Sequence, residues 1–307
     1  MKILLVRPRG FCAGVERAIE VVERALQRFG APVYVRHEIV HNAVVVQDLR
    51  RKGAVFVDQL AEVPKGAPVI FSAHGVGPTV FAEAETLRLN AIDATCPLVT
   101  KVHQEARAFA ARGMSILLVG HRKHVEVEGV FGEAPERITV VESPEEAEQV
   151  QVPDPEKVAV LTQTTLSIDE AERTLSVLRR RFPALATPPK EDICYATTNR
   201  QQAVKRLGSD VDLWLVIGDR TSSNSNRLRE IAAACGVPAH LILDEQAIDP
   251  AWLRGVRAVA ITSGASTPEV SVQAVVRRLR ALGATEVEEV AGPREEIEFA
   301  LPEELRV

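Results

Sequence analysis

The feature that most constrains the fold is a short apolar run followed by a polar loop and a helical segment. It recurs along the chain, with runs that begin at residues 33, 69, 116, 158, 213 and 259. Continuous runs of β-branched residues and leucine suit strands that are buried on both faces of a parallel sheet. Segments between them, such as TKVHQEARAFAARG, have the composition of helices. This order predicts an α/β fold built from small, mostly parallel sheets.

Three of the four cysteines occupy equivalent places in this pattern. Cys12, Cys96 and Cys194 each stand where a helix is expected to begin. Each is followed 28–30 residues later, and again 62–72 residues later, by a strand that ends in hydrogen-bonding side chains. A further strand without a polar end lies between each pair, starting at residues 54, 138 and 239. The chain therefore contains one pattern three times.

The spacing predicts three α/β units, residues 13–96, 97–193 and 194–284. We expect the strand within residues 1–12 to pack with the third unit, and residues 285–307 to form a C-terminal tail. In open parallel sheets, ligands bind beyond the carboxyl ends of the strands. Units packed around a pseudo-threefold axis would bring three thiols and six polar loops to one cavity, around which the three sheets would be arranged.

Thiolates gathered at one point are the soft ligands that zinc and iron–sulfur clusters use. No cysteine belongs to a C-x-x-C pair, and structural disulfides are not expected in a reducing cytoplasm. Zinc would normally take a fourth ligand, whereas a 4Fe–4S cluster on three cysteines leaves one iron open for Lewis-acid catalysis. A lone free cysteine is usually an inert core residue, and Cys96 also fits a nucleophile. The matched positions favour a shared site for three cysteines, and Cys235 is expected to be structural.

Polar side chains follow the strands at the expected ligand edge. Imidazole can donate to an anion, and hydroxyl or amide groups before a helix either cap it or help to bind an anion. Taken singly each loop fits a structural role, but the repeated position favours ligand binding. These side chains are His41, His74, His124, Thr164, Thr165, Ser222, Ser223, Asn224 and Ser266.

A carboxyl group lies among these histidines. Glu126 follows His124 by two residues and fits a proton donor beside an open metal, although a surface glutamate is the ordinary alternative. Glu128 lies in the same loop, and the alternation alone does not choose between the two. Neither a G-x-G-x-x-G after a strand nor a Walker A sequence is present, so the corresponding nucleotide folds are poorly supported.

Charge and hydropathy limit the partners. The chain has 307 residues and a net charge of −5, which argues against nucleic acid or an anionic membrane as a partner. No apolar run approaches the roughly 20 residues of a membrane span, and the N-terminus does not look like a signal peptide. We expect a cytoplasmic protein.

The stretches that carry these residues together resemble the 4-hydroxy-3-methylbut-2-enyl diphosphate reductase family, also called the LytB family. The resemblance covers essentially the whole chain in the expected order. One departure is Val125, where proline is expected in many relatives, which bears on the stiffness of that loop. The matching stretches are PRGFCAGVERAI, YVRHEIVHN, FSAHGVG, DATCPLVTKVH, HVEVEG, TQTTLS, DICYATTNRQ, SSNSNRL and SGAST.

The resemblance implies an oxidoreductase that converts (E)-4-hydroxy-3-methylbut-2-enyl diphosphate to isopentenyl and dimethylallyl diphosphate. This two-electron reductive dehydroxylation ends the methylerythritol phosphate route to isoprenoids. The implied cofactor is one 4Fe–4S cluster with Cys12, Cys96 and Cys194 as ligands and one open iron site. The implied electron donor is a ferredoxin or a flavodoxin.

The resemblance also implies roles for single residues. Glu126 is the implied acid, assisted by Thr164 and His124. The implied ligands of the substrate's diphosphate are His41, His74, His124, Thr165, Ser222, Ser223, Asn224 and Ser266.

Three other functions stay open from the residues. A non-catalytic iron–sulfur sensor would need the cysteines but neither the anion-binding loops nor Glu126. A zinc-dependent hydrolase would use the same thiolates and would be colourless. A sugar- or nucleotide-binding α/β protein would keep its ligand binding after replacement of all three cysteines.

Overall fold

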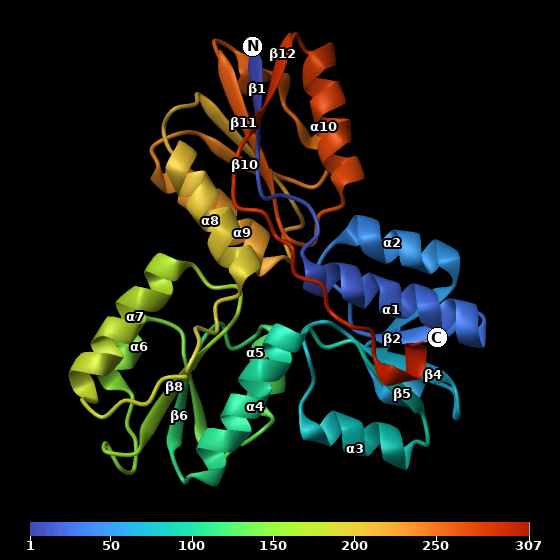
Figure 1. The fold of residues 1–307 in the computed structure, drawn as a ribbon, viewed down its shortest axis with the longest axis vertical. Helices are drawn as coiled ribbons and strands as arrows, with labels where there is room; N and C mark the ends of the chain where they lie inside the picture. Colours follow the sequence, from blue (N-terminus) through green and yellow to red (C-terminus); the bar gives the residue numbers. More distant parts are fainter. Residues whose placement is uncertain (307) are drawn as a thin grey trace. The chain divides into compact units, whose positions relative to one another are not determined.

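The computed structural model describes residues 1–306, which form three parallel sheets with helices between their strands (Figure 1). The chain divides into two compact units, which are described separately below. The first unit comprises residues 1–15, 41–47 and 195–298. The second comprises residues 16–40, 48–194 and those from 299 onward. Helices α1 (Ala13–Phe29) and α2 (Ala43–Lys52) begin in the first unit and continue in the second.

The first unit holds a five-stranded sheet with a hydrophobic core on each face. Its strands in order are β10 (Ala239–Ile242), β9 (Leu213–Ile217), β11 (Ala258–Ser263), β1 (Lys2–Val6) and β12 (Glu286–Val290). Its helices are α8 (Tyr195–Leu207), α9 (Ser223–Ala234), α10 (Glu269–Ala281) and the short η2 (Glu245–Ala247) and η3 (Pro250–Leu253). Side chains alternate along β9, so Leu215 joins the cluster with α10 while Trp214 joins the cluster with α8 and α9. Figure 1 shows α10 and the α8–α9 pair on opposite sides of this sheet.

The second unit holds two sheets. The first contains β3 (Ala54–Val57), β2 (Val33–Arg36), β4 (Pro68–Phe71) and β5 (Asn90–Asp93), with η1 (Leu60–Glu62) and α3 (Pro78–Thr86). The second contains β7 (Ile138–Val141), β6 (Ser115–Val119) and β8 (Val158–Thr162). Helices α4 (Pro97–Ala111) and α5 (Val125–Phe131) cover one face of this sheet, and α6 (Pro144–Gln149) and α7 (Ile168–Arg181) cover the other (Figure 1). The short helix η4 (Glu303–Leu305) follows near the C-terminus.

The three sheets repeat one strand order, which confirms the predicted fold class. The orders are β3-β2-β4, β7-β6-β8 and β10-β9-β11, and the strand expected to lack a polar end is at the edge each time. A fourth position, beside β4, β11 or β8, is filled by the segment that leads to a cysteine. Strand β5 precedes Cys96, β1 precedes Cys12, and a bridge from Ala186 to Ala159 precedes Cys194.

The boundaries of three separate domains stay a prediction. Strand β1 pairs with β11 of the third predicted unit. The segment expected to be a C-terminal tail contributes β12, which pairs with β1 through Val287 and its neighbours.

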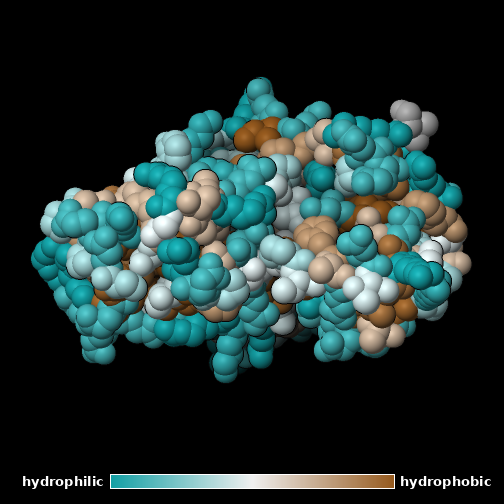
Figure 2. Space-filling model, turned by 90° about the horizontal axis from the view of Figure 1, so that it is seen from below, coloured by the Kyte–Doolittle hydropathy of each residue, from teal (hydrophilic) through white to brown (hydrophobic). Residues whose placement is uncertain are grey.

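The surface carries scattered apolar side chains in a mostly hydrophilic setting. Exposed large hydrophobic residues are Phe29, Val55, Phe81, Phe131, Val270 and Ile297. The face shown in Figure 2 is mostly hydrophilic, with hydrophobic patches interrupted by polar residues. Among residues 1–306, no helix combines the length and the apolar composition that crossing a bilayer requires.

A buried ion pair in the first unit yields a stability prediction. The side chain of Arg200 is 0% exposed, and its guanidinium donates to both carboxylate oxygens of Glu295 at 3.0 and 3.1 Å. Replacing Glu295 by alanine would leave the buried guanidinium without its counter-charge, which should lower the free energy of unfolding by about 3–5 kcal/mol. Chemical denaturation measures this loss, with Glu296→Ala at the exposed neighbouring position as the matched control. A loss equal to that of the control would contradict the prediction.

Candidate functional site

Each of the three cysteines makes a backbone hydrogen bond of the same kind. The N–H of Cys12 donates to the carbonyl of Ala265, that of Cys96 to Ala73, and that of Cys194 to Thr164, at 3.1, 3.0 and 3.1 Å. Each acceptor lies two residues past the end of a strand, namely β11, β4 and β8. The three predicted metal ligands are therefore held in the same way within their own sheets.

The residue after each acceptor is one of the predicted anion ligands. Ala73 precedes His74, Thr164 precedes Thr165, and Ala265 precedes Ser266. In each of the three repeats, a cysteine segment thus lies next to a loop that carries one of these polar side chains. This pairing could not be obtained from the spacing of the cysteines alone, because it depends on the hydrogen bonds between loops.

Each cysteine stands at the start of a long helix. Cys12 precedes α1, Cys96 is the N-cap residue of α4 ahead of Pro97, and Cys194 precedes α8. Burial raises the pKa of Cys12, while the charge of Arg200 and the backbone N–H groups of Val15 and Gly14 act in the opposite direction. A helix start and a nearby cation both favour a thiolate. This donor set fits an anionic metal centre.

Glu126 is a buried carboxyl group, not a surface residue. It is 2% exposed, and its oxygens accept the backbone N–H of Thr164 at 2.6 Å and the Thr164 hydroxyl at 2.8 Å. Burial raises its pKa to about 6, although both hydrogen bonds from Thr164 act to lower it. Glu128, the alternative in the sequence, is exposed. The structure thus separates the two carboxyl groups and pairs Glu126 with the predicted partner Thr164.

His74 and His124 lie beside each other in the second unit. Their ring centroids are 6.0 Å apart and the rings are steeply inclined, at 81°. His124 is the N-cap residue of α5, and its Nδ1 accepts the N–H of Glu126 at 3.2 Å. In the neutral imidazole the proton is therefore on Nε2, which can donate to an anion. The Nδ1 of His74 contacts the hydroxyl of Ser72 at 3.1 Å.

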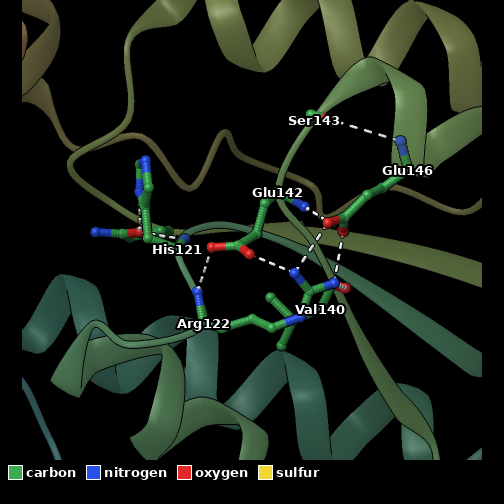
Figure 3. A network of polar contacts seen from close by, with 7 residues as sticks. His121, Arg122, Val140, Glu142, Ser143 and Glu146 are labelled. Carbon is green, nitrogen blue, oxygen red and sulfur yellow. Dashed lines mark hydrogen bonds and ion pairs between the residues drawn. The ribbon is translucent and has the colours of Figure 1, made fainter.

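The loop that leads from β6 to His124 is anchored at two points. Arg122 pairs with the carboxylates of Glu142 and Glu146 and donates to the carbonyl of Val140 (Figure 3). The backbone N–H of His121 donates to the side-chain carbonyl of Gln163 at 3.1 Å. These contacts hold the loop without the proline that relatives are expected to have at Val125.

Gln163 is a functional candidate that the sequence reasoning missed. It is 1% exposed, and its amide nitrogen donates to the hydroxyl oxygen of Thr165 at 2.8 Å. The Thr165 hydroxyl proton is therefore directed elsewhere and can be donated to an anion. The only signal in the sequence was its place in the loop TQTTLS, one residue before Thr164.

In the first unit the predicted polar residues connect through the loop after β11. The hydroxyl of Ser266 donates to the backbone carbonyl of His41 at 2.9 Å. The side-chain oxygen of Asn224 accepts the N–H of Ala265 at 3.0 Å, and its nitrogen lies 3.4 Å from the hydroxyl of Thr197. Because the carbonyl of Ala265 also accepts the N–H of Cys12, Asn224 and Cys12 both contact the backbone of this one residue.

The two serines before α9 differ. Ser222 is the N-cap residue and accepts the N–H of Ser225 at 3.3 Å, so the capping role considered from the sequence is present. The hydroxyl of Ser223 is buried without a hydrogen-bond partner among the described residues. A bound anion would satisfy such a hydroxyl. Cys235 ends α9, and its thiol contacts the carbonyl of Ile231 at 3.3 Å.

Within residues 1–306, no three His, Cys, Asp or Glu side chains are grouped as the ligands of a single metal ion would be. Thiolates that bind different irons of one cluster lie further apart than the ligands of one ion. The matched cysteines at helix starts therefore remain suited to a cluster, and the ligand set itself is a proposal developed below.

Comparison with known proteins agrees with this arrangement. The family model described as LytB protein matches residues 3–280. The 4-hydroxy-3-methylbut-2-enyl diphosphate reductase of Acidothermus cellulolyticus is 57% identical over 306 residues, covering 99% of this chain and 90% of the relative. The reductase of the same name from Bordetella pertussis is 56% identical over 304 residues, covering 99% and 94%.

A solved structure is also closely similar. The E-1-hydroxy-2-methyl-but-2-enyl-4-diphosphate reductase from Plasmodium falciparum matches with a TM-score of 0.95 and 39% identity, covering 99% of this chain and 96% of the other. Sequence and fold therefore agree over almost the entire length, and the chain belongs to the LytB family of 4-hydroxy-3-methylbut-2-enyl diphosphate reductases.

Proposed function

We propose that this chain removes the allylic hydroxyl group of (E)-4-hydroxy-3-methylbut-2-enyl diphosphate by two-electron reduction, which yields isopentenyl and dimethylallyl diphosphate. The observation that carries this proposal is the threefold pairing of a cysteine segment with the carbonyl next to a predicted anion ligand. Each of the three loops would then supply one ligand to a metal centre and one to a phosphate group. Family membership supports the same reaction.

Cys12, Cys96 and Cys194 would hold the cofactor, which we propose to be one 4Fe–4S cluster with an iron that has no protein ligand. Such a cluster, when bound, supplies electrons one at a time and a Lewis-acidic iron. The substrate demands this chemistry, because hydroxide is a poor leaving group. Zinc on the same three thiolates would be colourless and has no redox chemistry, so it could not supply the electrons.

The polar side chains bind and orient the substrate. Imidazole Nε2 of His124, the hydroxyls of Thr165 and Ser223, and the other predicted ligands donate to the diphosphate. These ligands are His41, His74, Ser222, Asn224 and Ser266, and Ser266 would donate once its hydroxyl turns away from the His41 carbonyl. Fixing the diphosphate also fixes the position of the carbon that carries the hydroxyl group. Such orientation can lower the activation barrier by several kcal/mol, and by roughly 7–11 kcal/mol in ideal cases.

Glu126 holds the proton that the departing hydroxyl group needs. Its burial keeps the carboxyl protonated to a higher pH than usual, with a pKa of about 6. Thr164 orients it through two hydrogen bonds. A non-catalytic sensor would have no use for a buried acid held in this way.

The electrons come from a protein donor, for which we propose a ferredoxin or a flavodoxin. We place the reaction in the cytoplasm, because a reducing compartment preserves the thiolate ligands that the proposed cluster needs.

Anaerobic purification followed by iron and sulfide analysis tests the proposal. We expect brown protein with iron and sulfide close to four of each per chain, and turnover of the allylic alcohol diphosphate with a chemical reductant. Zinc in a colourless, fully active sample would overturn the proposal. Iron and sulfide without turnover would favour the sensor function.

A further inference from the structure

A basic side chain follows each of the three cysteines by about one and a half helical turns. Arg17 lies five residues after Cys12, Lys101 five residues after Cys96, and Arg200 six residues after Cys194. They lie on α1, α4 and α8. Through its hydrogen bonds, each of these basic side chains connects one cysteine segment to the next.

Arg17 reaches the segment that precedes Cys96. Its guanidinium donates to the backbone carbonyl of Ala94 at 3.1 Å and to that of Thr95 at 3.0 Å. Its Nε donates to the carbonyl of Ala300 at 2.7 Å. The helix after the first cysteine is thus tied to the two residues before the second.

Lys101 reaches the segment that precedes Cys194. Its ammonium contacts the Asp192 carboxylate at 2.7 Å, the Lys190 carbonyl at 2.8 Å and the Glu105 carboxylate at 3.1 Å. Asp192 is 5% exposed, and its second oxygen accepts the N–H of Thr162 at 2.9 Å. All three ammonium protons therefore have an acceptor, and the segment before the third cysteine is held to the helix after the second.

Arg200 reaches the segment that precedes Cys12. Its guanidinium donates to the carbonyl of Gly10 at 2.9 Å and to that of Ala196 at 3.0 Å, besides the contacts with Glu295. The nearby Tyr195 hydroxyl accepts the N–H of Ala13 at 3.3 Å. The helix after the third cysteine is thus tied to the residues on both sides of the first.

These contacts close a cycle. In each case the basic side chain reaches the residue two positions before the next cysteine, namely Ala94, Asp192 and Gly10. Helix capping or general packing would not require the same offset three times around the three cysteines. Each contact lies within one of the two compact units, so none depends on how the units are placed.

We propose that Arg17, Lys101 and Arg200 are positioning residues that hold the three cysteine segments at the spacing one iron–sulfur cluster requires. This inference rests on the proposed function. Each cation contacts a segment that would hold the negatively charged cluster, and its charge would stabilise that cluster further when an electron is added.

Chelator challenge of the anaerobic holoenzyme tests this positioning role. Arg17→Met and Lys101→Met should release iron about tenfold faster than the unaltered protein, because each loses hydrogen bonds made by a charged group. The reduction potential of the retained cluster should shift to a more negative value. Arg17→Lys keeps the charge, so it should restore most of the potential even if iron release stays faster.

Arg24→Met is the matched control, because Arg24 lies on the same helix as Arg17 and its side chain is 46% exposed. Circular dichroism shows whether each variant is folded. Arg17 and Lys101 are tested in preference to the fully buried Arg200, whose replacement could prevent folding. Unchanged release and potential in Arg17→Met and Lys101→Met would overturn the inference and leave the proposed function standing. Absence of iron in the unaltered protein would instead refute the proposed function.

Discussion

Replacing Cys96 by alanine is expected to abolish turnover and to leave the purified protein without an intact cluster. Cys96 is the N-cap residue of α4 and makes no side-chain cap hydrogen bond there, so the helix does not need its thiol. The backbone contact to Ala73 is made by the main chain and would remain. The loss should therefore be chemical and not a consequence of misfolding.

Anaerobic iron and sulfide analysis with an absorption spectrum measures this loss. Cys235→Ala is the matched control, because Cys235 ends α9 and its thiol only contacts the Ile231 carbonyl. We expect that control to keep its iron and its activity. A fully active Cys96→Ala protein would refute the shared cysteine site, and loss of iron in both variants would show that the assay does not separate ligands from structural thiols.

The second large effect is expected at Glu126. Glu126→Gln keeps the size and the contact with the Thr164 hydroxyl, but it removes the acidic proton. Turnover should fall by about 100- to 10,000-fold, the contribution of a general acid, while iron content and substrate binding are kept. Glu128→Gln, at the exposed carboxyl of the same helix, should be close to unchanged.

The pH dependence has a defined sign. Because burial raises the pKa of Glu126 to about 6, the proton is held below that pH, and turnover should decline as the pH rises through it. Thr164→Val removes a hydroxyl that stabilises the carboxylate, so the pKa should rise further and the decline should move to higher pH. A profile that is identical in Glu126→Gln and the unaltered protein would exclude Glu126 as the proton donor.

Much of the architecture could be predicted from local patterns. Strand β9, the run LWLVI, is buried at every position, so its composition alone identified a strand covered on both faces. The spacing of the cysteines revealed the repeat, because a helix begins at each of them and strands with polar ends follow at similar intervals. Strand β12 was missed, since its sequence EVEEV is mostly exposed and charged and lacks an apolar run.

The site was only partly accessible in this way. The choice between Glu126 and Glu128 could not be made, because both are glutamates two residues apart and only the fold shows which one is buried against Thr164. Gln163 was missed because an amide in a polar loop has no distinctive pattern. Its importance comes from hydrogen bonds with the Thr165 hydroxyl and with His121, which is 42 residues away.

By itself, the sequence determined the α/β class, the threefold repeat and which three cysteines occupy matched positions, since these depend on periodicity and on residue type. Only the tertiary structure decided which carboxyl is buried, and which carbonyl each cysteine and each of Arg17, Lys101 and Arg200 reaches. The physical reason is that burial and long-range hydrogen bonds are set by where distant loops meet. No local pattern encodes a contact between Arg200 and Gly10, which are 190 residues apart.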